Sequence, residues 1–111
     1  MRHVVDVNPL SEPVFLILLS LSDQPKHGYL LIQHVEKLSD GRVRMSTGTL
    51  YGALRRMLED DWIERCACED SVRDKQCYRL TRVGRDVLNQ EHDRLKQLMR
   101  VSGALLRVKE A

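Results

Sequence analysis

Aromatic side chains are scarce in this 111-residue chain, where they make up 5% of the residues and include a single tryptophan. The core is therefore expected to consist of aliphatic side chains from packed helices, within one domain of ordinary size. No charge of one sign dominates, because 18 basic residues stand against 16 acidic ones and leave a net charge of +2. This balance excludes a plainly polybasic protein and does not by itself indicate nucleic-acid binding.

Long apolar runs are absent as well. The best run, residues 14–21, is far shorter than the roughly 18 apolar residues that a membrane-spanning helix requires. Arg2 is not followed by the apolar segment and small-residue cleavage site of a secretory signal. Three cysteines, two of them one residue apart, form a poor disulfide framework. These absences together predict a protein of the reducing cytoplasm with no membrane partner.

Apolar periodicity predicts two helices in the first part of the chain. The first begins at Ser11, a good N-cap, and is apolar on nearly every side as far as residue 21, so we expect it at the centre of the core. The second opens at His27 and runs to about Leu38. A turn signal at residues 39–41 follows it.

Residues 46–62 predict a third helix with two distinct faces. Ser46 is a good N-cap for it, because its hydroxyl accepts a hydrogen bond from a free N–H in the first turn. One apolar stripe recurs at three- and four-residue spacing and is expected to face the core: Leu50, Leu54, Met57 and Leu58. Thr47, Tyr51 and Arg55 recur at a spacing of four, so they form a second stripe that points elsewhere.

Two glycines, Gly48 and Gly52, lie inside this predicted helix. Each is expected to cost about 1 kcal/mol relative to alanine. Positions without a side chain beside threonine, tyrosine and arginine allow a large partner to approach closely, and a DNA backbone or groove floor is one such partner. The alternative is that the glycines accommodate a neighbouring helix.

The chain changes character after the third helix. Two segments with alternating polarity, 62–69 and 75–80, are separated by a polar stretch, which predicts a β-hairpin with a charged tip. Ile63 on the first strand and Tyr78 and Leu80 on the second are predicted to face the core.

A long last helix is predicted from Thr81, a cap candidate, to Val101 or further, with Ser102-Gly103 as a candidate end or kink. Its apolar stripe is larger than a domain of this size can cover alone, so we expect it to pack against a second copy of the chain. The residues predicted to make this dimer are Leu88, Leu95, Leu98, Met99 and Leu105. The alternative is an amphipathic helix folded back on its own core.

The predicted fold is mainly α-helical with a small β-hairpin, an α+β arrangement. Three helices, a hairpin and a further helix, in that order, make the winged-helix version of helix-turn-helix, here with an added C-terminal dimerisation helix. We divide the chain into an N-terminal arm at 1–10, a winged-helix DNA-binding domain at 11–80, and a dimerisation helix with its tail at 81–111. In this design the third helix enters the major groove and the hairpin is the wing.

Three segments resemble the PadR family of bacterial transcriptional regulators: HGYLLIQHVE at 27–36, GTLYGALRRMLEDDWI at 48–63, and YRLTRVGRDVL at 78–88. The resemblance implies a homodimeric repressor that binds a palindromic DNA operator and is released by a small-molecule or stress signal. It also implies a short-tailed member whose single C-terminal helix makes the dimer. The chain departs from the family pattern at Asp60-Asp61, where relatives often have a glycine. It also lacks the tryptophan that multidrug-sensing relatives carry in the dimerisation helix.

The resemblance places the start of the third helix at the DNA and Tyr29 near a phosphate. Arginines one turn further on, and basic residues of the wing, are candidate phosphate contacts, because phosphates attract flexible cations. The predicted DNA-binding residues are Tyr29, Ser46, Thr47, Thr49, Tyr51, Arg55, Arg56, Arg73 and Lys75. A solvated surface position is the alternative for each arginine.

Two other functions stay open. The first is a winged-helix protein-interaction module without DNA binding. The second is a thiol-based redox or metal sensor in the wing, because the hairpin brings Cys66, Cys68 and Cys77 within reach of one another. These cysteines lack a clear fourth zinc ligand, so we predict no metal and no cofactor. No phosphate-cradling glycine loop, nucleophile elbow or His-Glu-x-x-His motif occurs, so we do not expect an enzyme.

Overall fold

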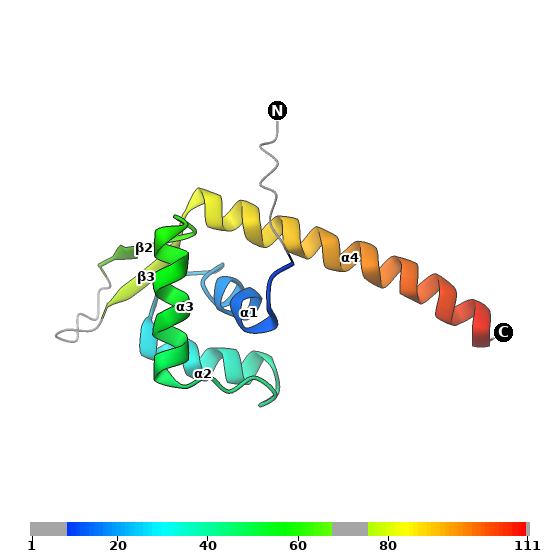
Figure 1. Ribbon diagram of the computed structural model, residues 1–111, viewed down its shortest axis with the longest axis horizontal. Coiled ribbons are helices and arrows are strands. Elements are labelled where there is room, and N and C mark those ends of the chain that lie inside the picture. Colours follow the sequence, from blue (N-terminus) through cyan, green and yellow to red (C-terminus); the bar gives the residue numbers. More distant parts are fainter. Residues whose placement is uncertain (1–8, 68–75, 111) are drawn as a thin grey trace.

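Four helices and three short strands make up the part of the chain that the computed structural model describes, residues 9–67 and 76–110, with side chains described to residue 107. In chain order they are α1 (Glu12–Ser20), β1 (Lys26–His27), α2 (Gly28–Leu38), α3 (Thr47–Glu59), β2 (Ile63–Cys66), β3 (Cys77–Leu80) and α4 (Arg82–Glu110). Figure 1 shows α1, α2, α3 and the sheet gathered at one end, with α4 reaching away from them. The predicted winged-helix architecture is confirmed. The proposed arm lies largely outside the described residues.

The first helix is the centre of the core, as its apolar sequence predicts. Ser11 is its N-cap and accepts a hydrogen bond from the Val14 N–H at 3.4 Å. Ile17 and Leu18 are fully buried. The helix packs against both α2 and α4, so it holds the helical domain and the long helix together.

Both α2 and α3 end in the same hydrogen-bonded turn, with an aspartate in the left-handed conformation. Asp40 has φ 55° and Asp61 has φ 60°. After α3, the Trp62 N–H donates to the Met57 carbonyl at 2.9 Å and the Asp61 N–H to the Leu58 carbonyl, which satisfies two free carbonyls of the last turn. Aspartate tolerates this conformation, so the turn forms without the glycine that relatives often have there.

The sheet has one strand more than the sequence predicts. Its order is β1-β3-β2, and every pairing is antiparallel. The two-residue strand β1 extends the predicted hairpin by pairing Lys26 with Tyr78 and His27 with Cys77. Ile63 and Tyr78 are buried as predicted, and Leu80 is half-buried. Strand β1 therefore joins the start of α2 to the wing.

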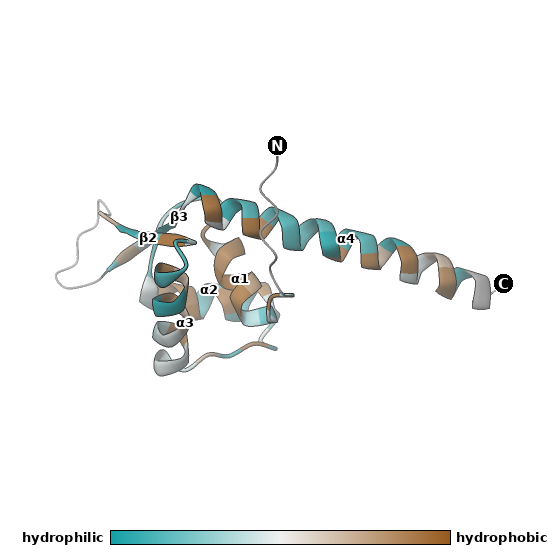
Figure 2. Ribbon diagram, turned by 45° about the horizontal axis from the view of Figure 1, so that its top comes forward, coloured by the Kyte–Doolittle hydropathy of each residue, from teal (hydrophilic) through white to brown (hydrophobic). Residues whose placement is uncertain are grey.

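The last helix continues past Val101, as the prediction allowed, and through the candidate end at Ser102-Gly103. Thr81 caps it by accepting a hydrogen bond from the Gly84 N–H at 3.0 Å. The helix continues for 29 residues, about 44 Å at 1.5 Å per residue, and Gly103 neither ends nor breaks it. Figure 2 shows apolar and polar bands alternating along the part that extends beyond the domain.

Candidate nucleic-acid interface

The outer face of α3 carries the stripe predicted from the sequence. Thr47 and Arg55 are exposed, and Tyr51 is 40% exposed. The adjoining face is fully buried at Leu50 and Leu54, so the helix is anchored by its apolar side while the stripe stays exposed. Within the described chain, no ion pair or hydrogen bond occupies the Arg55 guanidinium.

Ser46 and Thr49 use their hydroxyls in the helix cap. The Ser46 hydroxyl accepts from the Thr49 N–H at 3.1 Å and donates to the Thr49 hydroxyl at 2.9 Å. Both side chains are exposed at the start of α3. Both hydroxyls therefore help to begin the helix at a defined residue, and both lie at the end of α3 predicted to contact DNA.

A cluster of rings joins α3 to the start of α2. Tyr51 leans over Gly28, where an added Cβ would lie 2.9 Å from the tyrosine hydroxyl oxygen. Tyr29 is 37% exposed and stacks on the buried His27 ring, with 5.6 Å between centroids. Gly28 is thus required for the close approach of Tyr51, and His27 supports Tyr29 from below. The two tyrosines form one surface together with the α3 stripe.

Several other cations are already paired or lie outside the described residues. Arg42 pairs with Glu12, and Arg44 pairs with Glu36 at 3.3 Å. Both pairs are exposed, so they compete only weakly with a phosphate. The predicted wing contacts Arg73 and Lys75 lie outside the described residues.

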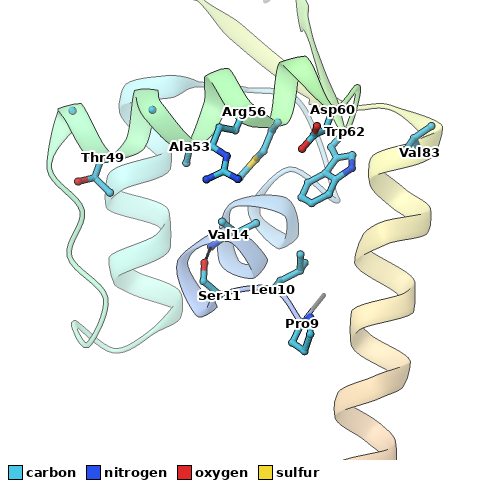
Figure 3. Close-up of a pocket in the computed structure, with 13 residues that line it drawn as sticks. Pro9, Leu10, Ser11, Val14, Thr49, Ala53, Arg56, Asp60, Trp62 and Val83 are labelled. Atoms are coloured by element: carbon cyan, nitrogen blue, oxygen red, sulfur yellow. Dashed lines mark hydrogen bonds between the residues drawn. The ribbon is translucent and has the colours of Figure 1, made fainter. Parts of the chain in front are cut away.

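Arg56 does not lie beside Arg55 on the outer stripe. Its guanidinium points into a cavity of about 920 Å³ between α3, the segment leading into α1, and the start of α4 (Figure 3). Gly48, Thr49 and Gly52 also line this cavity. An added Cβ at either glycine would meet nothing within 4 Å, so none of the described helices fills the space beside them.

The cysteine pattern differs from the expectation of unbonded thiols. Cys66 is a half-buried free thiol whose pKa is raised by burial. Cys77 lies directly opposite it on β3, is buried, and takes part in a disulfide. The third cysteine, Cys68, lies outside the described residues. A raised pKa lowers the thiolate fraction of Cys66 near neutral pH.

The predicted dimer residues divide into two groups. Leu88 is 6% exposed and belongs to the core of its own subunit, which corrects its assignment to a second copy. Further along α4 the other four are open to solvent: Leu95, Leu98, Met99 and Leu105. The sequence pattern does not separate these groups, because both continue one stripe.

Two other kinds of site are absent from the same described segments. No three His, Cys, Asp or Glu side chains there gather as a metal ion would need. No helix among these residues is both long and apolar enough to cross a membrane.

Three helices, an antiparallel wing and the exposed stripe on α3 define a winged helix-turn-helix protein. Residues 17–90 match the family described as "Transcriptional regulator PadR-like family". The chain therefore belongs to the PadR-like family of transcriptional regulators, whose members are regulators and not enzymes. No curated protein sequence matches it.

Solved structures show the same fold. A PadR family transcription regulator from Clostridium difficile is 21% identical, with a TM-score of 0.71 over 86% of this chain and 99% of that chain. A PadR-like regulator from Bacillus cereus is 26% identical, with a TM-score of 0.70 over 84% and 89%. A PadR-like transcription factor from Bacteroides fragilis is 26% identical, with a TM-score of 0.67 over 83% and 87%.

Proposed function

We propose that this protein is a dimeric repressor that binds palindromic operator DNA through α3. The observation that carries the proposal is the exposed surface formed by Thr47, Tyr51 and Arg55 together with Tyr29. An arginine that no described side chain pairs with, beside two hydroxyl-bearing rings, suits phosphate and base-edge oxygens and nitrogens.

The roles follow from position on the helix. Thr47 lies at the first residue of α3, the end that reaches base edges first when a recognition helix enters the major groove. Tyr51 follows one turn later, and its hydroxyl can reach either a phosphate or a base edge. Arg55 follows after another turn, where a flexible cation finds phosphate. Tyr29 contributes a second phosphate contact from the start of α2.

The distal part of α4 supports a homodimer. Leu98, Met99 and Leu105 are 51%, 72% and 66% exposed. Burying a leucine side chain of this kind contributes roughly 1.5–3 kcal/mol. Two copies joined by a two-fold axis would present two α3 helices to successive turns of DNA, which is why we propose a palindromic operator.

The regulatory part of the proposal is that a small-molecule or stress signal releases the repressor from DNA in the cytoplasm. Its support is the cavity that reaches α3 from the side opposite Tyr51. A protein-interaction module that has kept this fold without binding DNA is the competing function.

The test begins with selection of bound fragments from a genomic DNA library, followed by titration of the selected operator. Tyr51→Ala is expected to weaken operator binding about tenfold or more while the protein remains folded. The change removes a hydrogen bond to DNA and the contact of a 40% exposed ring with Gly28, and it leaves the buried face of α3 intact. Normal binding by this variant would contradict the role of Tyr51. Failure of the wild type to select any DNA would favour the interaction module.

Charge-matched variants supply the control. Arg55→Ala and Lys96→Ala each remove one exposed cation, the first from α3 and the second from α4. Removing a cation that binds one phosphate should reduce the slope of log affinity against log salt by about 0.9. We expect this reduction for Arg55→Ala and an unchanged slope for Lys96→Ala.

A further inference from the structure

The cavity beside α3 is open because the helix has small residues on that side. Gly52 and Ala53 line it, and one turn earlier so does Gly48. Leu10 and Val14 form the facing wall, from the segment that leads into α1 and its first turn (Figure 3). The volume of about 920 Å³ lies at the upper end of the range for small-molecule sites.

Two opposite charges point into this cavity from α3. Arg56 lies in the last turn of α3 and Asp60 is the C-cap four residues later, a spacing at which opposite charges attract one another. No ion pair or hydrogen bond between side chains joins them, and the described part of the chain gives neither charged group another partner. Figure 3 shows both groups directed toward the facing wall. The cavity therefore presents hydrogen-bond donors and an acceptor on one wall, where a ligand that offers both kinds of group can meet them.

An aromatic surface completes the lining. Trp62, which follows the α3 turn, is half-buried, and Figure 3 shows its indole ring beside Asp60. Met57 adds a polarisable sulfur to the lining. Rings that lie flat against an indole gain stacking energy beyond the area they bury.

We propose that this cavity binds a small planar heteroaromatic compound with a guanine-like edge. Ring and carbonyl acceptors on such a ligand would receive hydrogen bonds from Arg56. Adjacent N–H groups would donate to the Asp60 carboxylate, while the ring lies against Trp62. A carboxylic acid would satisfy only Arg56, and an organic cation only Asp60, so the paired charges favour a ligand that carries both kinds of group.

The inference deepens the proposed function and rests on it for its regulatory meaning. A ligand in the cavity contacts α3 at Gly52 and Ala53, on the side away from Tyr51. Any shift of α3 that it causes would move the DNA-contacting stripe with it. Binding of the ligand itself does not depend on DNA.

The test uses Trp62 as its reporter, because it is the only tryptophan in the chain. The full-length protein is titrated with guanosine, and tryptophan emission is followed without DNA. We expect saturable quenching by guanosine and at least about tenfold weaker binding of adenosine, whose edge lacks the paired N–H donors for Asp60. Absence of saturable quenching, or equal affinity for the two nucleosides, would overturn the proposal.

Matched variants locate the site. Arg56→Met and Asp60→Asn are expected to weaken guanosine binding about tenfold, whereas Arg55→Met, on the outer stripe, should leave it unchanged. If Arg55→Met and Arg56→Met weakened guanosine binding equally, the assignment of the binding site to this cavity would be contradicted. Emission that changes on dilution of the protein and not with guanosine would show that a second copy fills the cavity, which also overturns it.

Operator binding is measured on the same samples without guanosine. A wild-type protein that binds the operator but not guanosine would refute the ligand site alone. Guanosine binding without any operator would leave the ligand site standing and refute the proposed repressor.

Discussion

The two halves of α4 share one amphipathic pattern and meet opposite environments. In the proximal half, residues 82–94, Val87 and Leu88 are buried at 1% and 6% exposure in the subunit's own core. In the distal half, residues 95–107, Met99 and Leu106 are 72% and 60% exposed. The same periodic signal therefore encodes packing against the chain's own core in one half and an exposed apolar surface in the other.

The hydrogen bonds of Glu91 mark the point at which α4 stops being attached to the rest of the domain. Glu91, 6% exposed, accepts a hydrogen bond from the Leu10 N–H at 3.1 Å and two from Arg94 at 2.7 Å. The bond from Leu10 ties α4 to the segment that leads into α1. Further along, none of the other described elements lies beside the helix (Figure 1), and its apolar side chains are exposed.

The largest expected effect is on the distal half. Leu98→Glu should weaken the dimer by about a thousandfold or more, because a symmetric interface loses two buried leucines and gains two carboxylates. Sedimentation velocity over a range of concentrations measures the change.

Gln97→Glu adds the same charge at the neighbouring position and should leave the dimer nearly intact. A wild-type protein that sediments as a monomer at all concentrations would remove the dimer from the proposal. Equal weakening by both variants would show that charge, and not the apolar stripe, controls assembly.

Two glycines give the sharpest test within a single subunit. A Cβ added at Gly84 would lie 1.9 Å from the Trp62 carbonyl oxygen, whereas one at Gly103 would meet only the end of Arg107, at 3.9 Å. Gly84→Ala should therefore lower the free energy of unfolding by about 3 kcal/mol or more. Gly103→Ala should raise it by up to about 1 kcal/mol. Chemical denaturation measures both free energies of unfolding. Similar effects of the two changes would contradict the claim that only the proximal half of α4 is packed against the domain.

The smallest expected effect tests the anchor at Glu91. Hydrogen bonds from Arg94, and also from the Leu10 N–H, hold the pKa of Glu91 below its usual value of 4.5 despite burial. The contribution of the Glu91 carboxylate to the free energy of unfolding is therefore present in full above pH 4.5. It is lost as the pH falls through the lowered pKa. Glu91→Gln should cost about 1–2 kcal/mol at pH 7, and the difference from wild type should shrink below pH 4.5.

Glu64→Gln is the matched control, because it disrupts an exposed pair with Arg79. Its expected cost is a few tenths of a kcal/mol, as for most surface ion pairs. A difference between Glu91→Gln and wild type that stayed constant from pH 7 to pH 3 would rule out the carboxylate as the source of the effect.

Most of the fold could be predicted because its signals are local. The caps at Ser11, Ser46 and Thr81 each satisfy an N–H within three residues, and apolar periodicity marks the helix faces from the sequence alone. The strand at Lys26–His27 could not be predicted, because two residues form a strand only when a partner some fifty positions away lies beside them.

The candidate site divides in the same way. The spacing of Thr47, Tyr51 and Arg55 places them on one face of α3 whatever surrounds the helix. Whether Arg56 faces a cavity depends on how α3 is placed relative to α1 and α4. The burial of Leu88 depends on where α4 packs against α1.

The amino-acid sequence by itself determined the helices, the wing, the outward stripe and the family, because hydrogen bonds and periodicity act over a few residues. Only the tertiary structure decided which apolar residues of α4 remain exposed and which charges of α3 face a cavity. Those outcomes depend on distances between segments far apart in the chain, and side-chain spacing along one helix carries no information about them.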